Sequence, residues 1–319
     1  MNSEKIKLSV VWLKRDLRLA DHEALYHALS SKKPCLILYV FEEILLNDFH
    51  YSSRHFNFIK QSLIDINNQL AILNTQVLCV KGSVIEVLEV LLKKYSIVLY
   101  SHQETGIGLT FDRDKELKLW ADSGGIQWYE FLQQGVFRRL PNRKKWIHLW
   151  TSHMNRPIFN FSPINDQLLS KASIASLEKD LVVMDLQTSK SKWFQPGGEQ
   201  NAKRYLNSFF EGRYLNYQKY ISKPDLARKS CSRLSPYIAW GNISMRQVLQ
   251  RTEEEKENGK ISSALSPFGS RLRWQAHFIQ KFEMECRMEY ESINKGYHAL
   301  VKEKDQDYLN AWEKGQTGI

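Results

Sequence analysis

Cysteine is scarce in this sequence, and its spacing encodes no local metal or redox pair. The 319 residues include four cysteines, and no two of them follow the C-x-x-C spacing. A zinc ribbon and a thioredoxin-like pair are therefore excluded as local motifs. Cys35 and Cys79 lie in apolar runs, where a buried and unreactive thiol is usual.

Long apolar runs are missing as well. Residues 1–7 are polar, and the run at Ser9–Leu13 is too short for the core of a signal peptide. No run approaches the roughly 20 apolar residues that a membrane-spanning helix needs. We therefore expect a cytoplasmic protein, in a reducing compartment, with no membrane partner.

The glycine motifs of common nucleotide enzymes are absent too. The first strand-like run leads into Lys14-Arg15-Asp16 instead of G-x-G-x-x-G, and Gly106-x-Gly108 lacks the third glycine. There is no Walker loop, no H-E-x-x-H and no G-x-S-x-G. An NAD enzyme, an NTPase, a zinc protease and an esterase thus lose their main sequence support.

What the sequence does contain is an alternation of strand-like and helix-like segments. Five apolar runs have the length of strands: Ser9–Leu13, Cys35–Phe41, Gln76–Lys81, Ile97–Ser101 and Ile126–Tyr129. The segments between them carry apolar residues at helical spacing. We expect Asp21, Ser53 and Ser83 to cap three of these helices, with Glu86 completing a capping box. The pattern predicts a doubly wound α/β domain with a parallel five-stranded sheet over residues 5–132.

The remaining chain differs in character. Residues 133–195 have weak periodicity and several prolines, which predicts an interdomain connector with short helices. Residues 196–319 are helical in pattern. The net charge of +10 and the aromatic content of 12% favour a polyanionic partner such as nucleic acid, although an AT-rich genome explains a basic balance equally well.

The exit of the first strand is the most distinctive stretch. Residues 11–25 read V-W-L-K-R-D-L-R-L-A-D-H-E-A-L, and we expect Arg15 and Arg18 to bind Asp16 and neighbouring carbonyls. This stretch resembles the N-terminal signature of photolyases and cryptochromes. Four further stretches are similar to the same family, in the same order: His102–Asp114, Gly135–Trp150, Pro196–Ala202 and Ser232–Arg246. Because five ordered stretches agree, the chain is identified as a member of this family.

The resemblance implies an antenna-type α/β domain followed by a helical domain that holds FAD. In the family, light excites the flavin, and a photolyase (a lyase) then passes an electron to a pyrimidine dimer in DNA. A cryptochrome instead signals without turnover. The resemblance therefore leaves three hypotheses: a DNA-repair enzyme, a blue-light receptor without repair activity, and a truncated remnant without flavin function.

Two stretches match the family's flavin contacts. Cys231, Ser232, Arg233, Leu234 and Ser235 correspond to the segment that binds the FAD diphosphate, where a helix start with hydroxyls and a cation makes an anion site. We expect a serine cap for the helix that follows at about Pro236. Tyr217 has the family's spacing for a flavin-contacting tyrosine, although a core stripe with Tyr214 and Tyr220 explains it as well.

The segment Phe268–Ile279 matches the family's substrate-facing helix. Its helical spacing places five side chains on one face: Arg271, Trp274, Gln275, Phe278 and Phe282. Trp274 corresponds to the tryptophan that lines the dimer pocket, and a packed core tryptophan is the equal alternative. Photolyases usually have Glu where Arg271 stands and Arg where Gln275 stands. Since an arginine accepts no hydrogen bond, this departure favours a receptor or a divergent photolyase.

The last residues, Trp312 to Ile319, are similar to a family motif that normally continues into the part of the fold that contacts the flavin ring. We therefore expect a C-terminally truncated chain that binds FAD poorly by itself, with FAD and DNA bound by the full-length protein. The resemblance also implies an antenna chromophore of unspecified type near His102–Asp114.

Overall fold

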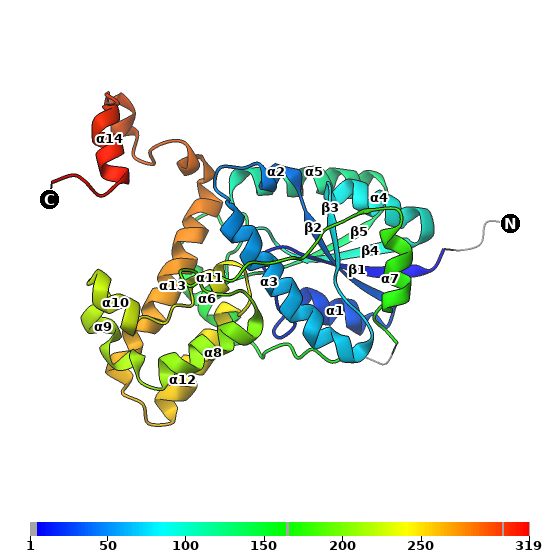
Figure 1. The fold of residues 1–319 in the computed structure, drawn as a ribbon, viewed down its shortest axis with the longest axis horizontal. Coiled ribbons are helices and arrows are strands. Elements are labelled where there is room, and N and C mark those ends of the chain that lie inside the picture. The colour runs from blue at the N-terminus through cyan, green and yellow to red at the C-terminus, as the bar shows by residue number, and fades with distance from the viewer. Residues whose placement is uncertain (1–4, 164–165, 302, 319) are drawn as a thin grey trace.

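The computed structural model describes residues 5–163, 166–301 and 303–318, and it confirms the predicted α/β architecture. Five parallel strands form the body of one sheet in the order β5-β4-β1-β2-β3 (Figure 1). Their bounds are β1 Lys7–Leu13, β2 Cys35–Phe41, β3 Leu78–Lys81, β4 Ser96–His102 and β5 Gln127–Phe131.

The prediction of five strands missed one strand at the edge. Val182–Val183 form β6, which pairs antiparallel with Val80 and Lys81 of β3 and makes the sheet six-stranded. Both β6 side chains are exposed. A two-residue strand without a buried face leaves no alternation in the sequence that could reveal it.

Helices cover both faces of the sheet. Those of this part of the chain are α1 Glu23–Ser30, α2 Glu43–Leu46, α3 Ser53–Leu70, α4 Val84–Lys94 and α5 Gly108–Ser123, with a 3₁₀ turn at Ala71–Leu73. Along β1, Val11 and Leu13 pack under α1 and α3, whereas Val10 and Trp12 pack under α4 and α5. The inner strands β1, β2 and β4 are buried on both faces and mainly apolar, as the sequence predicted, whereas the edge strand β5 has no buried residue.

One of the three predicted helix caps is confirmed. The Ser83 hydroxyl accepts a hydrogen bond from the Glu86 N–H at 3.3 Å, and the Glu86 carboxylate accepts one from the Ser83 N–H at 3.1 Å. For α3 the prediction was wrong by one residue, since Ser52 is the cap and Ser53 is the first helical residue. Both residues are serines, so composition alone does not separate them.

The predicted cap of α1 was wrong for a different reason. His22 caps this helix, and its Nδ1 accepts a hydrogen bond from the Leu25 N–H at 3.1 Å. Asp21 has a positive φ of 53°, and its carboxylate lies 2.6 Å from the Arg246 guanidinium. The Asp21 carboxylate therefore pairs with Arg246, a residue distant in the sequence, and does not cap α1 as the local pattern predicted.

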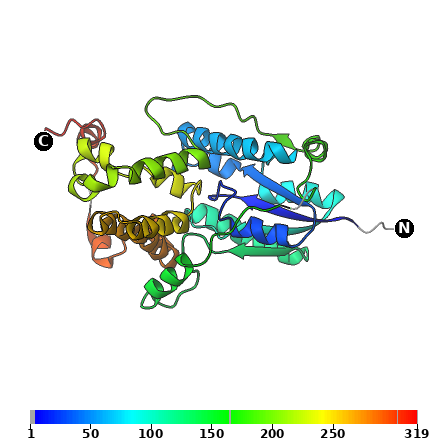
Figure 2. The ribbon, with the colours of Figure 1, turned by 90° about the horizontal axis from the view of Figure 1, so that it is seen from below.

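Beyond β5 the chain leaves the sheet. It forms α6 Trp146–Met154, whose Trp146 and Trp150 are buried, and then α7 Lys171–Glu178, which packs beside α4. After β6, residues 184–196 run as an extended segment above α3 (Figure 2). We call residues 184–196 the strap. They lead into the helical part of the molecule.

The helical part lies at the carboxyl ends of the parallel strands (Figure 1). Its helices are α8 Glu199–Phe210, α9 Tyr217–Tyr220, α10 Pro224–Ser230, α11 Ser235–Ala239, α12 Met245–Glu257, α13 Ser262–Met284 and α14 Gln306–Glu313, with 3₁₀ turns at Arg213–Asn216, Cys286–Glu289 and Lys295–Ala299. The helix α14 has no buried residue and stands apart from the other helices. Ile319, the last residue of the predicted motif, lies outside the described residues.

The two parts meet at a close backbone contact. Gly241 has a φ of +69°, and a Cβ atom at this position would lie 2.1 Å from the carbonyl oxygen of Arg15. Around it, Arg18 donates to the Gly241 carbonyl at 3.0 Å, and Asn242 donates to the Leu17 carbonyl at 2.9 Å. Glycine is required here because any side chain would push the two backbones apart.

The predicted role of the two arginines after β1 was right for the neighbouring carbonyls and wrong for Asp16. Arg18 donates to the carbonyl oxygens of Asp21 and Gly241, while the Arg15 guanidinium bonds a tyrosine hydroxyl. Asp16 is instead held by two histidines. The motif at the exit of β1 therefore joins the two parts of the molecule.

Candidate functional site

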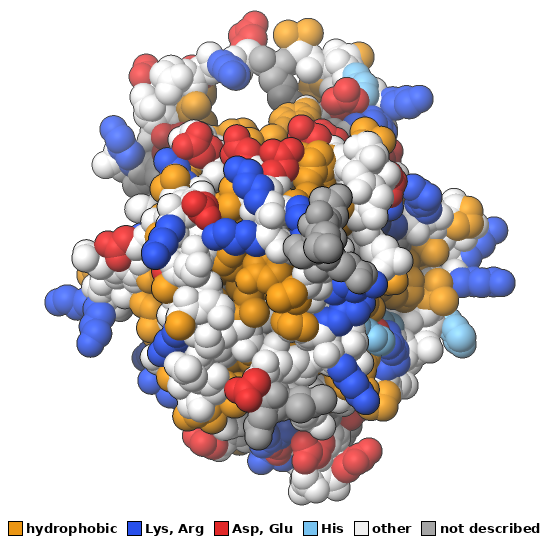
Figure 3. Space-filling model, turned by 90° about the vertical axis from the view of Figure 1, so that its right-hand side faces the viewer, with side chains coloured by type: hydrophobic (Ala, Val, Ile, Leu, Met, Phe, Trp, Pro, Cys, Tyr) orange, Lys and Arg blue, Asp and Glu red, His pale blue; other side chains and the backbone are white. Residues whose placement is uncertain are grey.

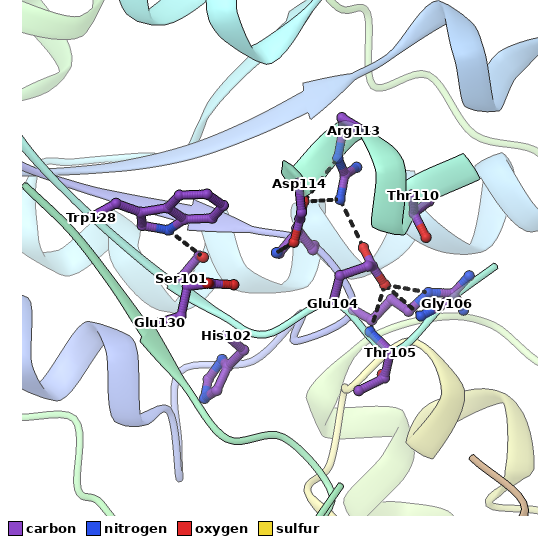
Figure 4. Close-up of polar contacts among 12 residues, drawn as sticks. Ser101, His102, Glu104, Thr105, Gly106, Thr110, Arg113, Asp114, Trp128 and Glu130 are labelled. Carbon is purple, nitrogen blue, oxygen red and sulfur yellow. Dashed lines mark hydrogen bonds and ion pairs between the residues drawn. The ribbon is translucent and has the colours of Figure 1, made fainter. Parts of the chain in front are cut away.

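The carboxyl ends of β1 and β4 lie side by side where the connections of the sheet diverge. From β1 the chain winds to β2 and β3 on one side, and β4 and β5 lie on the other side. Ligands of open α/β sheets bind at such a switch point. In this protein, charged side chains from the ends of β1 and β4 and from α5 occupy it (Figure 4).

Arg113 is the centre of this charged cluster. Its guanidinium contacts three carboxylates: Glu104 and Asp114, each at 2.8 Å, and Glu42. Lys14 supplies a second cation, 2.8 Å from Asp114. These five side chains are at most 8% exposed, so neither water nor salt screens their interactions effectively.

Opposite charges in the cluster stabilise the ionised forms of Glu104 and Arg113, whereas burial raises the pKa of Glu42. Burial raises the pKa of Glu104, but Arg113, Lys14 and Arg15 outweigh it and lower that pKa to about 2. Burial likewise lowers the pKa of Arg113, and the surrounding carboxylates more than reverse this effect. Trp12 lies against both cations, with its ring centre 4.6 Å from Lys14 Nζ and 4.7 Å from Arg113 Cζ. The cluster therefore satisfies its own charges without a ligand.

A second buried group surrounds Asp16. One of its carboxylate oxygens lies 2.6 Å from His102 Nδ1 and 3.1 Å from His22 Nε2. Burial raises the pKa of Asp16, yet the two histidines bring it well below its usual value. Burial and His22 lower the pKa of His102 to about 4. Because His22 Nδ1 accepts from the Leu25 N–H, its Nε2 carries the proton that faces Asp16.

These three side chains are also of the types that bind metals. Their ligand atoms lie within 4.8 Å of one another. The arrangement includes one hydrogen bond, between His102 Nδ1 and Asp16, while His22 Nε2 lies close to the same carboxylate oxygen without hydrogen-bond geometry.

Of the cavities that border the clusters, two adjoin Glu104. One of about 20 Å³ lies between Trp12, Tyr51 and Trp240, and it has room for a single water at most. The other, of about 240 Å³, lies between α5 and the end of α13, with Glu104 and Phe111 on one wall. The segment 102–114, predicted to adjoin an antenna chromophore, thus lines a cavity on one side and holds the charged cluster on the other.

The predicted flavin-contacting tyrosine is part of a core. Tyr217 is buried, with its ring nearly perpendicular to those of Phe209 and Phe268 at 5.7 Å and 5.6 Å. Burial raises its pKa, and the charge of Arg271 opposes this effect. Tyr217 therefore lies within electrostatic reach of the predicted substrate-facing helix.

The predicted diphosphate segment precedes a helix of only five residues, α11. The N-cap of α11 is Leu234, and no hydroxyl caps it, so the predicted serine cap was wrong. The Ser232 hydroxyl instead accepts a weak hydrogen bond from the Leu234 N–H at 3.4 Å. Leu234 is buried and Ser235 is exposed, so Leu234 can offer a ligand only backbone groups.

Two arginines in or near this segment differ in the partners of their guanidinium groups. Arg213 donates to the backbone carbonyls of Tyr205 and Cys231. Arg233 is half-buried, has a positive φ of 59°, and lies over the Tyr205 ring with its Cζ 5.3 Å from the ring centre. Of these two cations, Arg233 is the one whose donors are not used by backbone carbonyls in the described residues.

The predicted substrate-facing residues do share one face of α13. Arg271 is exposed, Trp274 is 51% exposed and Phe278 is 52% exposed, whereas Gln275 is half-buried. The rings of Trp274 and Phe278 are 5.8 Å apart. The opposite face is buried, through Phe268, Leu272 and Ala276.

Tyr217 packs against Phe268 of α13, which lies about one turn before Arg271. Trp274 and Phe278 lie one and two turns further along α13. What sequence reasoning missed is the charged cluster around Arg113. Its signal was available, because charged residues that directly follow two buried parallel strands meet at one edge of the sheet.

Comparison with known proteins agrees with this arrangement. Residues 9–142 match the family model for DNA photolyase. The chain is 22% identical to cryptochrome-1 of Spalax judaei over 98% of its own length and 57% of that protein, and 23% identical to the deoxyribodipyrimidine photo-lyase of Alkalihalophilus pseudofirmus over 100% of its own length and 68% of that protein. The fold is similar to a Synechocystis cryptochrome, with a TM-score of 0.79 at 20% identity over 100% of this chain and 70% of that one.

Residues 9–142 therefore match the photolyase family, and over its whole length the chain is similar in sequence and fold to photolyases and cryptochromes. It spans little more than half the length of the Spalax cryptochrome. The residues that match the photolyase family model, 9–142, include most of the α/β part. No helix in the described parts of the chain is both long and apolar enough to cross a membrane.

Proposed function

We propose that this photolyase/cryptochrome chain is part of a blue-light-dependent flavoprotein that repairs pyrimidine dimers in DNA. FAD, when bound and reduced, supplies the electron that splits the dimer. Tyr217 and the segment 231–235 bind the flavin, and the exposed face of α13 receives the DNA. An archaeal photolyase of similar fold, from Sulfolobus tokodaii, contains two FAD molecules, which supports flavin as the cofactor.

The observation that carries this proposal is the exposed aromatic face of α13, formed by Trp274 and Phe278. Arg233 has a guanidinium suited to two phosphate oxygens. Trp274 has more than half of its indole free to stack on a base that has left the duplex. The four cysteines are free thiols, which supports a location in the reducing cytosol.

Binding of FAD tests the first half of the proposal. In a titration followed by flavin fluorescence, Arg233→Ala should weaken FAD binding about tenfold, because a charged hydrogen bond contributes about 1.5–3 kcal/mol. Arg251→Ala is the matched control, since Arg251 pairs with Glu255 on α12, away from segment 231–235. Equal affinities for both variants would refute the flavin role of Arg233.

A blue-light receptor without repair activity is the second candidate, and Arg271 favours it. The guanidinium cannot accept a hydrogen bond from a dimer, and the resemblance implies a carboxylate there in repair enzymes. An assay with reduced FAD, blue light and an oligonucleotide carrying a thymine dimer distinguishes the two. We expect slow repair by the unmodified protein and faster repair by Arg271→Glu. If neither repairs while the bound flavin still responds to light, the repair function is wrong and the receptor is favoured.

A further inference from the structure

A groove of about 1000 Å³ lies between α3 and the strap, outside the proposed flavin and DNA site. Three cations line it: Arg54 and Lys60 from α3, and Lys190 from the strap. The other lining residues are neutral, and none of the described lining residues is an Asp or a Glu. In a protein with 35 acidic residues, a groove of this size with cations alone is selective for anions.

The α3 wall of the groove is one polar stripe. Ser53, Asn57, Lys60 and Gln61 follow at the i, i+4, i+7 and i+8 positions, so they lie on the same side of the helix. This stripe faces the strap in the view of Figure 2. The groove therefore accounts for the position of Asn57, Gln61 and Lys60, which lie on the side of α3 that faces away from the hydrophobic core.

The strap is fixed to this stripe at one point. The Asn57 side chain donates to the Ser189 carbonyl at 3.0 Å and accepts from the Ser189 N–H at 2.8 Å. Gln61 donates to the same carbonyl at 3.1 Å and accepts from the Gly197 N–H at 2.8 Å. The two walls are therefore held at a set separation before any ligand enters, which lowers the entropic cost of binding.

One exposed aromatic side chain lines the groove, and a second one precedes it in the sequence without lining the groove. Phe194 lines it and is 53% exposed, and its neighbour Trp193 is 75% exposed. Arg54 Cζ lies 5.5 Å from the Phe194 ring centre, so cation and ring are adjacent. Alternating cations and open ring faces are what a single strand of nucleic acid requires, with phosphates on the cations and bases stacked on the rings.

The acidic residue of each wall, Asp185 of the strap and Asp65 of α3, lies outside this charge pattern. Asp185 of the strap accepts from the Gln187 N–H, and Asp65 of α3 accepts from the Gln200 N–H, and neither lines the groove. The face at the amino ends of the strands is different, because acidic and basic side chains are intermixed there (Figure 3). Basic residues on that face are suitable controls for charge alone.

We propose that the groove between α3 and the strap binds single-stranded nucleic acid without sequence preference. Arg54, Lys60 and Lys190 contact phosphates, and Phe194 and Trp193 stack on bases. A single strand is favoured over a duplex because a duplex keeps its base faces stacked internally and offers none to the two rings. The inference goes beyond the proposed photorepair, since it needs neither FAD nor a dimer.

The electrostatic test uses a fluorescein-labelled dT12 oligonucleotide, titrated in the dark without FAD and followed by anisotropy at several salt concentrations. The double variant Arg54→Gln/Lys60→Gln should bind at least tenfold more weakly. Its slope of log affinity against log salt should fall by about 1.4, which is two phosphate contacts at roughly 0.7 each. Lys7→Gln/Lys93→Gln removes the same charge from two exposed lysines at the amino ends of the strands and should keep the slope.

The stacking test removes the rings. Trp193→Ala/Phe194→Ala should weaken dT12 binding about fivefold or more, and Trp193→Phe should retain most of the affinity. All substituted side chains lie at the surface or in the open groove, and unchanged melting temperatures verify that the variants fold.

Three results would overturn the proposal: groove variants that bind like the lysine control, a duplex that binds as tightly as dT12, or a Trp274→Ala variant that loses as much affinity as the groove variants. The last result would assign single-strand binding to α13. A failure of FAD binding or photorepair changes none of these measurements.

Discussion

The α/β part and the helical part of this molecule differ in whether their candidate functional side chains are buried or exposed. At the carboxyl edge of the sheet, Arg113 and its carboxylates are buried and paired with one another. On α13, Trp274 and Phe278 are more than half exposed, and their rings contact each other and His277. The first arrangement is complete without a ligand, whereas the second leaves apolar surface available to one. The charged cluster is therefore satisfied within the fold, whereas the binding role proposed for the aromatic face depends on its exposure.

The largest effect should come from the centre of the charged cluster. Arg113→Met leaves three buried carboxylates with too few cations, and we expect a loss of about 3–5 kcal/mol in the free energy of unfolding. Urea denaturation measures it. Arg251→Met is the control, because the Arg251 side chain is 40% exposed and its ion pair should contribute at most about 1 kcal/mol. Similar losses for the two variants would mean that the buried cluster is no more important than a surface pair.

The junction between the two parts should be nearly as sensitive. Gly241→Ala adds a Cβ 2.1 Å from the Arg15 carbonyl oxygen at a φ of +69°, and we expect a loss of about 3 kcal/mol from backbone strain and overpacking together.

Gly259→Ala separates these two causes. Gly259 also has a positive φ, of +90°, but no atom lies within 4 Å of the added Cβ, so strain alone should cost about 1–2 kcal/mol. Thermal unfolding compares the pair. If both substitutions destabilise equally, the close approach of the two backbones contributes nothing.

The smallest effect on stability should come from the aromatic face. Trp274→Ala and Phe278→Ala should each change the free energy of unfolding by less than about 0.5 kcal/mol, because the side chains are half exposed. Leu272→Ala, one turn away on the buried face of the same helix, should cost about 2–5 kcal/mol. A large loss from the exposed pair would show that these rings are structural, and it would remove the contrast between the two parts.

Much of the α/β part could be predicted because its signals are local. The strands β1, β2 and β4 follow from apolar runs that are buried on both faces, and the Ser83–Glu86 box marks the start of α4. The edge strand β6 could not be predicted, since its two exposed residues carry no periodic pattern.

The candidate site was predictable only in part. The face of α13 follows from helical spacing, so Arg271, Trp274 and Phe278 were grouped correctly. The cap at segment 231–235 was wrong because Arg233 adopts a left-handed backbone conformation and α11 begins with Leu234 as its cap. Serine pairs near a proline indicate a helix start but do not fix which residue begins it.

By itself the sequence determined the resemblance to photolyases and cryptochromes, the succession of strands and helices in the α/β part, and the face of α13, because these depend on local runs, spacing and motif order. Only the tertiary structure decided which charges meet. Asp21 is a helix cap by local pattern, but Arg246 lies 225 positions further along the chain and binds its carboxylate instead. Pairing across such distances depends on how the two parts dock, and docking is set by close contacts such as that of Gly241 with Arg15, which no local pattern encodes.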